Sequence, residues 1–321
     1  MTTTTEAPLP IVRRFPAVAA VPRARLGDYP TPVQHVVIGS REFALKRDDR
    51  CGTLIGGNKV RGLEFLLGGV VPGDAVLTVG PRGSTHALAT ARCATALGAT
   101  VTVVRWNQVM NDAARRVDNH LRREARILDA RWVPSAYAVA AALRMRRRVR
   151  WIPAGGASAL AVLGHVNAAL ELARQVGAGE CTEPDRVYVP LGTGGTAAGL
   201  SLGLHIAGLA TRVRAVRVAP RIIASAGRIR WLANAAARLI ERLSGERVPR
   251  VPRDLITVEH DFYGGAYGRP LGAIPATEAT LAPLGIRLDD TYSRKAFAAA
   301  AAGDASHPLL WLTFDGRLLQ D

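Results

Sequence analysis

Short apolar runs alternate with longer amphipathic segments over most of the chain. Val36-Val37-Ile38 and Phe43-Ala44-Leu45 flank Gly39-Ser40 and predict a β-hairpin. Residues 60–67 are apolar at helical spacing, which predicts a helix directly after a Gly-rich loop. Further strands are expected at 75–79, 101–104, 130–133, 186–191, 214–218 and 309–313. Further helices are expected at 84–97, 113–128, 136–148, 160–176, 197–209, 225–243, 277–284 and 293–302.

This order of strands and helices is typical of parallel sheets with helices on both faces. The 321 residues are 48% hydrophobic, which is enough to bury the cores of about two domains. No window holds about 18 uninterrupted apolar residues, so we expect no membrane span. The polar start at 1–10 lacks the features of a secretion signal. Three scattered cysteines fit a reducing cytoplasm, and the absence of close Cys/His pairs predicts no metal site.

The chain is strongly basic, with a formal net charge of +16. A nucleic-acid surface is one interpretation, with the densest basic run at 144–150. The other basic residues are scattered and lack accompanying aromatic residues, so specific nucleic-acid binding is not expected. Only Lys46, Lys59 and Lys295 are lysines. An imine requires an amine that can lose its proton, which arginine does not provide, so these three are candidates for covalent chemistry.

The strongest candidate binding site is a Gly-rich loop between an expected strand and an expected helix. Its N–H groups and the helix N-terminus suit a phosphate, although a tight turn that needs glycine would have the same sequence. It lacks the lysine of a nucleotide P-loop and does not match the dinucleotide-binding pattern. The loop consists of Gly192, Thr193, Gly194, Gly195 and Thr196.

Two more loops carry candidate chemistry. Ser84 and His86 lie where a strand gives way to a helix, the edge of a parallel sheet at which ligands gather. Ser84 would either bind a carboxylate or only cap the helix. His86 by itself would more often be a packed or solvent-facing side chain than a catalyst. Lys59 follows Gly56-Gly57-Asn58 and would either point its amine into a loop-lined cavity or lie on the surface.

Together these residues resemble the pyridoxal phosphate (PLP) enzymes grouped as 1-aminocyclopropane-1-carboxylate deaminase and D-cysteine desulfhydrase. The resemblance is most specific at 46–49 and 56–67, and it continues at 29–32, 152–158, 263–268 and 288–296. It implies the fold of tryptophan synthase β, which is fold type II. In that α/β fold, two three-layer domains with parallel sheets hold the cofactor in the cleft between them. Residues 1–60 and 171–321 would form the large PLP-binding domain and 61–170 the small substrate-side domain of a cytoplasmic homodimer.

The resemblance also implies roles at matching positions. Lys59 would hold PLP as a Schiff base and shuttle protons, with Asn58 and the loop 192–196 binding the cofactor. Ser84 would bind the substrate carboxylate or assist proton transfer. The remaining site residues would be Thr85 and His86 for substrate binding, Tyr267 and Tyr292 as catalytic groups beside the substrate, and Ser293 opposite the pyridine nitrogen.

Three residues depart from the family pattern. Ser293 stands where several members have Glu, which would weaken the electron sink and argues against cyclopropane ring opening. Thr85 replaces Asn and Asp315 replaces Gly, and we interpret both as changes around the substrate rather than around Lys59. The sequence therefore predicts a PLP-dependent lyase or deaminase that removes a β-substituent and ammonia from a small amino acid, as D-cysteine desulfhydrase does. A β-replacement enzyme and a catalytically altered member with a scaffold role remain alternatives.

Overall fold

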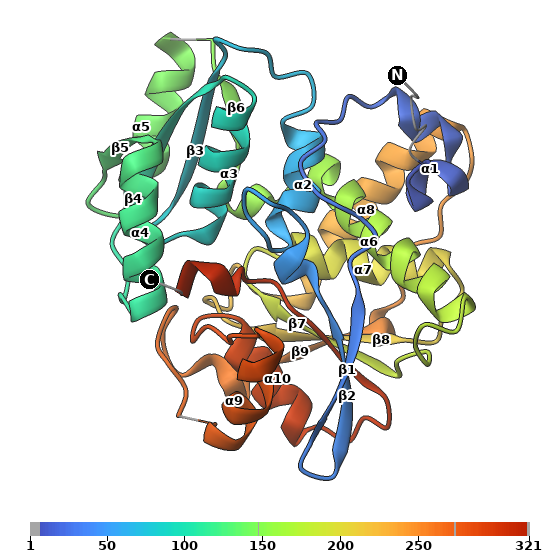
Figure 1. The fold of residues 1–321 in the computed structure, drawn as a ribbon. Coiled ribbons are helices and arrows are strands. Elements are labelled where there is room, and N and C mark those ends of the chain that lie inside the picture. The colour runs from blue at the N-terminus through green and yellow to red at the C-terminus, as the bar shows by residue number, and fades with distance from the viewer. Residues whose placement is uncertain (1–6, 147, 273, 320–321) are drawn as a thin grey trace, which may run out of the picture.

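Two β-sheets organise the protein, and each forms the centre of one lobe (Figure 1). The computed structural model describes residues 7–146, 148–272 and 274–319. One sheet has six strands in the order β1-β2-β10-β7-β8-β9, and the other has four in the order β5-β4-β3-β6. The strands are β1 Val33–Ile38, β2 Arg41–Lys46, β3 Ala75–Pro81, β4 Thr100–Trp106, β5 Arg126–Asp129, β6 Arg150–Ile152, β7 Arg186–Leu191, β8 Arg212–Arg217, β9 Ile256–Glu259 and β10 Pro308–Trp311.

Helices cover both faces of each sheet, and the chain folds strand by strand as the alternating pattern predicts. All neighbouring strands run parallel except β1 and β2, which form the predicted hairpin. The helices are α1 Pro10–Arg14, α2 Lys59–Leu66, α3 Thr85–Ala96, α4 Asp112–Glu124, α5 Val133–Arg146, α6 Ala159–Gly177, α7 Gly195–Ile206, α8 Ala226–Ser244, α9 Pro275–Leu281 and α10 Ser293–Ala302.

Each lobe has three layers because successive strand residues point to opposite faces. In the four-stranded sheet, Val76 packs in the core with α3 and α4, while Leu77 packs with α5. In the six-stranded sheet, Val187 packs in the core with α6, α7 and α8, while Tyr188 packs with α10. The predicted fold class, two parallel-sheet three-layer units, is confirmed.

Some element predictions were wrong. The strand expected at 130–133 lies instead at β5, and Val133 already begins α5. The helix expected to continue to residue 128 ends at Glu124, because Ala125 has an extended backbone with φ −145° and ψ 152°. β5 lies at the edge of its sheet and has exposed charged residues at both ends. Its polar and apolar residues therefore follow the same spacing as those of the helix before it, which is why the helix was predicted to continue through it. The short strands β6 and β9 were not expected.

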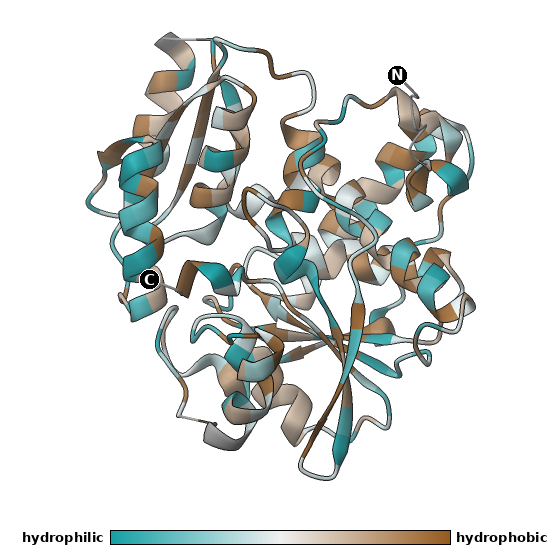
Figure 2. Ribbon diagram, in the orientation of Figure 1, coloured by the Kyte–Doolittle hydropathy of each residue, from teal (hydrophilic) through white to brown (hydrophobic). Residues whose placement is uncertain are grey.

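β3 is largely hydrophobic, whereas α4 is largely hydrophilic (Figure 2). Within the described ranges no helix is long and apolar enough to cross a membrane. The predicted domain boundary between residues 170 and 171 falls inside α6, which is one continuous helix. The division into a large and a small domain at these residues stays a prediction.

Candidate active site

The loop that carries Lys59 is fixed by close backbone contacts. Gly57 has φ +100°, and a Cβ there would lie 2.6 Å from the Thr313 carbonyl oxygen, so only glycine fits. The Gly56 N–H donates to Asp315 Oδ2 at 2.7 Å. Lys59 follows as the first residue of α2. The glycine pair therefore lets the loop pack against the chain after β10 and sets where the lysine begins its helix.

The Lys59 amine is the unusual group in this loop. Burial lowers its pKa from 10.5 to about 8, so about a tenth of the amine is neutral at pH 7. No hydrogen bond or ion pair among the described residues engages it. Two buried histidines, His86 on α3 and His165 on α6, face its charge. Their pKa values fall through burial first and through the Lys59 charge second, so both imidazoles are neutral.

The predicted phosphate loop lies beside Lys59. Asn58 Nδ2 donates to Thr196 Oγ1 at 2.6 Å and joins the start of α2 to the start of α7. A third Gly-rich turn reaches the same place, since a Cβ on Gly155 would lie 2.3 Å from Thr193 Oγ1. A Cβ on Gly192 would meet nothing within 4 Å, so the loop is open on that side. A glycine loop that is open at Gly192 and leads into the N-terminus of a 12-residue helix forms a cradle for an anion.

These residues fit pyridoxal phosphate. An unengaged lysine amine with a lowered pKa suits the aldehyde, and the open loop 192–196 suits the phosphate. Among the described residues, no group of three or more His, Cys, Asp or Glu is placed to hold a metal ion.

The substrate-side residues meet the C-terminal part of the chain. Ser84 caps α3, because its Oγ accepts from the Ala87 N–H at 3.2 Å. Thr85, the next residue, lies near Tyr292 and lowers the pKa of its phenol. The hydroxyls of Tyr292 and Tyr267 are in direct contact, with ring centroids 6.1 Å apart. Burial raises the pKa of both phenols, so they are protonated donors at neutral pH.

Ser293 is the first residue of α10 and is buried. Its N–H donates to Asp289 Oδ1 at 2.9 Å, and Asp289 Oδ2 accepts the N–H groups of Thr291 and Tyr292. Asp289 thus organises the start of α10, which the sequence did not indicate. The role of Ser293 opposite a pyridine nitrogen stays a prediction.

Asp315 corrects one interpretation of the sequence. We expected this departure from the family pattern to lie around the substrate, but its carboxylate binds the Gly56 N–H on the lysine loop. It also forms an ion pair with Arg317 at 2.8 Å. The chain returns from β10 to pack under residues 56 and 57, a contact between distant segments that no local pattern reveals.

Other site residues escaped prediction as well. Arg228 on α8 donates from Nε to the Thr193 carbonyl at 3.0 Å, which brings a positive charge to the open loop. Asn111, which caps α4, donates to the Gly268 carbonyl and to Thr291 Oγ1, each at 2.9 Å. Since 39 of the 42 basic residues are arginines, nothing in the sequence distinguished Arg228 from the others.

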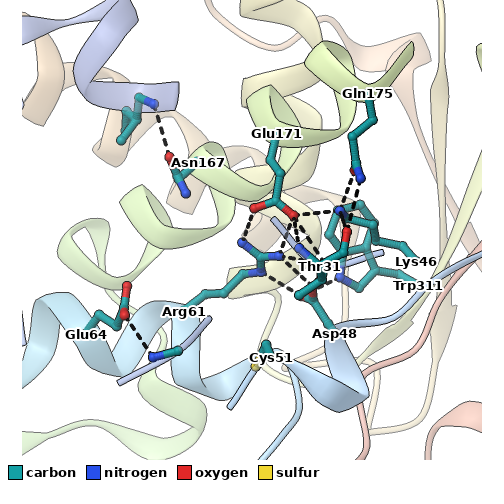
Figure 3. A network of polar contacts seen from close by, with 12 residues as sticks. Thr31, Lys46, Asp48, Cys51, Arg61, Glu64, Asn167, Glu171, Gln175 and Trp311 are labelled. Atoms are coloured by element: carbon teal, nitrogen blue, oxygen red, sulfur yellow. Dashed lines mark hydrogen bonds and ion pairs between the residues drawn. The ribbon is translucent and has the colours of Figure 1, made fainter. Parts of the chain in front are cut away.

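A buried ionic network anchors α2 two residues after Lys59 (Figure 3). Arg61 pairs with Asp48 at 2.7 Å and with Glu171 at 3.0 Å. Lys46 pairs with the same Glu171 at 2.6 Å, and Trp311 Nε1 donates to Asp48 at 2.7 Å. The two positive charges of Arg61 and Lys46 are balanced by the two negative charges of Asp48 and Glu171. They connect α2 to β2, β10 and α6, so the helix that positions Lys59 is held by both polar and apolar contacts.

Comparison with known proteins decides the family. The model of a family described as pyridoxal-phosphate dependent enzymes matches residues 24–308. The chain belongs to this family. It is 31% identical over 299 residues to D-cysteine desulfhydrase of Klebsiella pneumoniae, covering 88% of each protein. It is 34% identical over 325 residues to nocardicin C-9' epimerase of Nocardia uniformis subsp. tsuyamanensis, covering 94% of each.

A solved structure described as a homologue of ACC deaminase has the same fold. It superposes with a TM-score of 0.75 at 27% identity and covers 98% of this chain and 99% of its own. The predictions of family, fold class, PLP as cofactor and enzymatic function are therefore confirmed. The individual roles of Lys59, Ser84, Tyr267, Tyr292 and the loop 192–196 stay predictions.

Proposed function

We propose that the protein is a PLP-dependent lyase or deaminase that releases a β-substituent and ammonia from a small amino acid. One observation carries the proposal. The Lys59 amine is unengaged and has a lowered pKa, and it follows Asn58, which binds the loop 192–196 where the turn at Gly155 also packs. The relative named D-cysteine desulfhydrase supports elimination as the reaction class.

The cofactor supplies the electron sink that stabilises negative charge at the substrate α-carbon. Lys59 Nζ is the proposed covalent anchor, and once released it is the base that accepts the α-proton. Burial favours its neutral form, which is the form that can accept a proton. Asn58, bonded to Thr196, keeps the lysine loop and the phosphate loop in register.

The paired phenols are the proposed proton source for the leaving substituent. Burial raises the pKa of Tyr267 and Tyr292, so neither is a base near neutral pH and either can donate its proton. Thr85 lies near the Tyr292 end of this pair. Ser84 caps α3, and with the N-terminus of that helix it would hold the substrate carboxylate, with Thr85 and His86 beside it.

Turnover tests the proposal directly. Purified protein with bound cofactor is supplied with a panel of small D- and L-amino acids that carry a β-thiol, β-hydroxyl or β-chloro group. We expect a keto acid and ammonia in equal amounts from at least one of them, and no product from Lys59→Ala. Arg115→Gln, which removes a largely exposed charge from α4, is the matched control and should retain activity. Absence of turnover with every amino acid would favour the catalytically altered scaffold.

Two other reactions use the same site. In β-replacement, an added thiol or amine would appear in the product instead of ammonia and a keto acid. The epimerase relative supports a second candidate, inversion at the α-carbon, which would exchange the α-proton with solvent deuterium without loss of the amine. The same panel, followed by mass and chirality of the products, separates the three reactions.

The oligomeric state and the cellular compartment of the protein are also proposals. We infer a cytoplasmic homodimer acting on a free amino acid, without specific nucleic-acid binding. Cys51, Cys93 and Cys181 are all buried and free, which suits a reducing compartment. Light scattering measures the oligomeric state, and retention on nucleic acid should disappear at moderate salt.

A further inference from the structure

The side chain of Asn111 joins the two lobes at the start of α4. The residue lies between β4 and α4, in the lobe of the four-stranded sheet, and is 6% exposed. Its Nδ2 donates to the Gly268 carbonyl oxygen and to Thr291 Oγ1, each at 2.9 Å. Both acceptors lie in the C-terminal part of the chain, whose helix α10 packs on the six-stranded sheet (Figure 1). One buried amide therefore crosses from one lobe to the other.

The hydrogen bonds of Asn111 fix the orientation of its amide group. Oδ1 accepts the Ala114 N–H at 2.8 Å, and that N–H can only donate. The Gly268 carbonyl can only accept, so it must face the NH2 group. Capping α4 uses the amide oxygen alone, and serine or aspartate would cap the helix equally well. The two N–H donors thus have a task other than capping.

Each acceptor of Asn111 is the direct neighbour of a tyrosine. Gly268 follows Tyr267, and Thr291 precedes Tyr292. The hydroxyls of these two tyrosines are in direct contact. Gly268 has φ +78°, and a Cβ there would lie 2.8 Å from the Val109 carbonyl oxygen, so glycine lets this loop lie against the other lobe. The bridge therefore acts on the backbone beside both phenols.

Other contacts hold the tyrosine segments within the six-stranded lobe. Asp289 accepts three N–H groups at the start of α10. Lys295 Nζ on α10 donates to the Tyr263 carbonyl at 2.6 Å, in the segment before the first tyrosine. These bonds do not reach the lobe that carries Ser84 and the N-terminus of α3, whereas the two bonds from Asn111 do.

We propose that Asn111 is a positioning residue that holds Tyr267 and Tyr292 as a pair against the lobe that carries Ser84. The inference rests on the proposed function, in which this pair protonates the leaving substituent. A general acid acts only within hydrogen-bond reach of the atom that it protonates, so a small displacement of the phenols slows proton transfer. Loss of the bridge should therefore slow eliminations that need a proton on the leaving group and spare those that do not.

A comparison of leaving groups tests this role in the protein with bound cofactor. Asn111→Ser keeps a good cap on α4 and removes the amide that bridges the lobes. Hydroxide leaves only with a proton, whereas chloride leaves without one. We expect kcat to fall roughly tenfold for a β-hydroxyl amino acid and less than about twofold for its β-chloro counterpart, with KM little changed. Equal losses for both substrates would indicate a merely structural role and overturn the proposal, as would no loss for either.

Thr291 provides a matched pair of variants on the other side of the bridge. Thr291→Ser keeps the hydroxyl that accepts from Asn111 and should keep the natural ratio of the two rates. Thr291→Val removes that acceptor without touching the cap of α4, and it should change the ratio in the same direction as Asn111→Ser. The same ratio in the Ser and Val variants would contradict the role of the bridge.

Tyrosine NMR supplies a readout that does not depend on turnover. The chain has six tyrosines, and the 13C-labelled signals of Tyr267 and Tyr292 are assigned by their loss in the Phe variants. Because the two hydroxyls are in contact, Tyr267→Phe should shift the Cζ signal of Tyr292. We expect this response to be largely lost in Asn111→Ser and kept in Thr291→Ser, and an undiminished response in Asn111→Ser would overturn the proposal.

The two readouts also separate this inference from the proposed function. If the NMR response is lost as expected but no amino acid is converted by the natural protein, the proposed function fails and the positioning of the tyrosine pair by Asn111 stands. If the natural protein is active and Asn111→Ser changes neither the NMR response nor the ratio of rates, only the inference about Asn111 fails.

Discussion

Glu171 is the residue of the buried network whose loss should cost the most stability. It is 3% exposed on α6 and is the shared carboxylate of Arg61 and Lys46. Burial alone would raise its pKa, but the charges of Arg61 and Lys46 outweigh burial and lower the pKa to about 2. A folded-state pKa roughly 2.5 units below the value of an unfolded Glu corresponds to about 3 kcal/mol at neutral pH.

The sign of this contribution fixes its pH window. A carboxyl with a lowered pKa stabilises the fold above the unfolded pKa and loses that effect as the pH falls through the folded pKa. The contribution of Glu171 should therefore be constant above about pH 5 and decline between pH 5 and 2. By pH 3, about 2 of the 3 kcal/mol should be gone.

Glu171→Gln tests the reasoning, because it leaves Arg61 and Lys46 buried with Asp48 as their remaining charged partner in the network. Breaking such a buried group by removing one partner costs about 3–5 kcal/mol in free energy of unfolding. The matched control is Glu42→Gln, since Glu42 is 65% exposed and its one ion pair within the described part of the chain, with His35, is worth less than about 1 kcal/mol.

Urea unfolding followed by tryptophan fluorescence gives the free energies at pH 7, 5, 4 and 3. We expect a large loss for Glu171→Gln, little change for Glu42→Gln, and a smaller decline between pH 5 and 3 in Glu171→Gln than in the natural protein. A Glu171→Gln protein no less stable than the Glu42→Gln protein at pH 7 would refute the reasoning.

Three further predictions concern the site itself. Ser84→Ala should lose turnover but keep its cofactor, at a cost of about 1 kcal/mol from the lost cap, as seen by product assay, absorbance and thermal unfolding; unchanged turnover with every active substrate would refute its role. Arg228→Ala should weaken phosphate-dependent cofactor binding by roughly tenfold in a fluorescence titration, because a charge beside Thr193 is lost. Asp315→Asn should lower stability and turnover together, since it disturbs the Gly56 turn; a stable protein with full turnover would show that the bond is dispensable.

The parts of the fold that follow from local pattern were predictable. The hairpin at Gly39 and the long helices α6 and α8 have a clear spacing of apolar residues, and the structure forms each element where that spacing predicts it. β5 and β9 were missed because each is a four-residue strand with polar residues, whose periodicity cannot be separated from that of a helix or loop, whereas the equally short β10 is apolar and buried throughout. Their strand character comes from pairing with β4 and β8 rather than from their own residues.

The same limit applies to the site. Lys59 and the loop 192–196 could be predicted, because glycines and a rare lysine mark them in the sequence and a family resemblance links them. The bond between Asn58 and Thr196, the Asp315 contact with Gly56 and the approach of Arg228 join segments from 35 to 259 residues apart. No local periodicity encodes such contacts, so they become visible only when the two sheets are placed together.

Chemical trapping of the lysine tests the central claim most directly. Borohydride reduces an imine between PLP and a lysine to a stable amine, and mass spectrometry of the digested protein then locates the modified residue. The chain offers only Lys46, Lys59 and Lys295, so the result is unambiguous. The account predicts modification of Lys59 alone and its complete absence in Lys59→Ala. Modification of Lys295, whose pKa burial also lowers to about 8, or of Lys46 in place of Lys59 would contradict it.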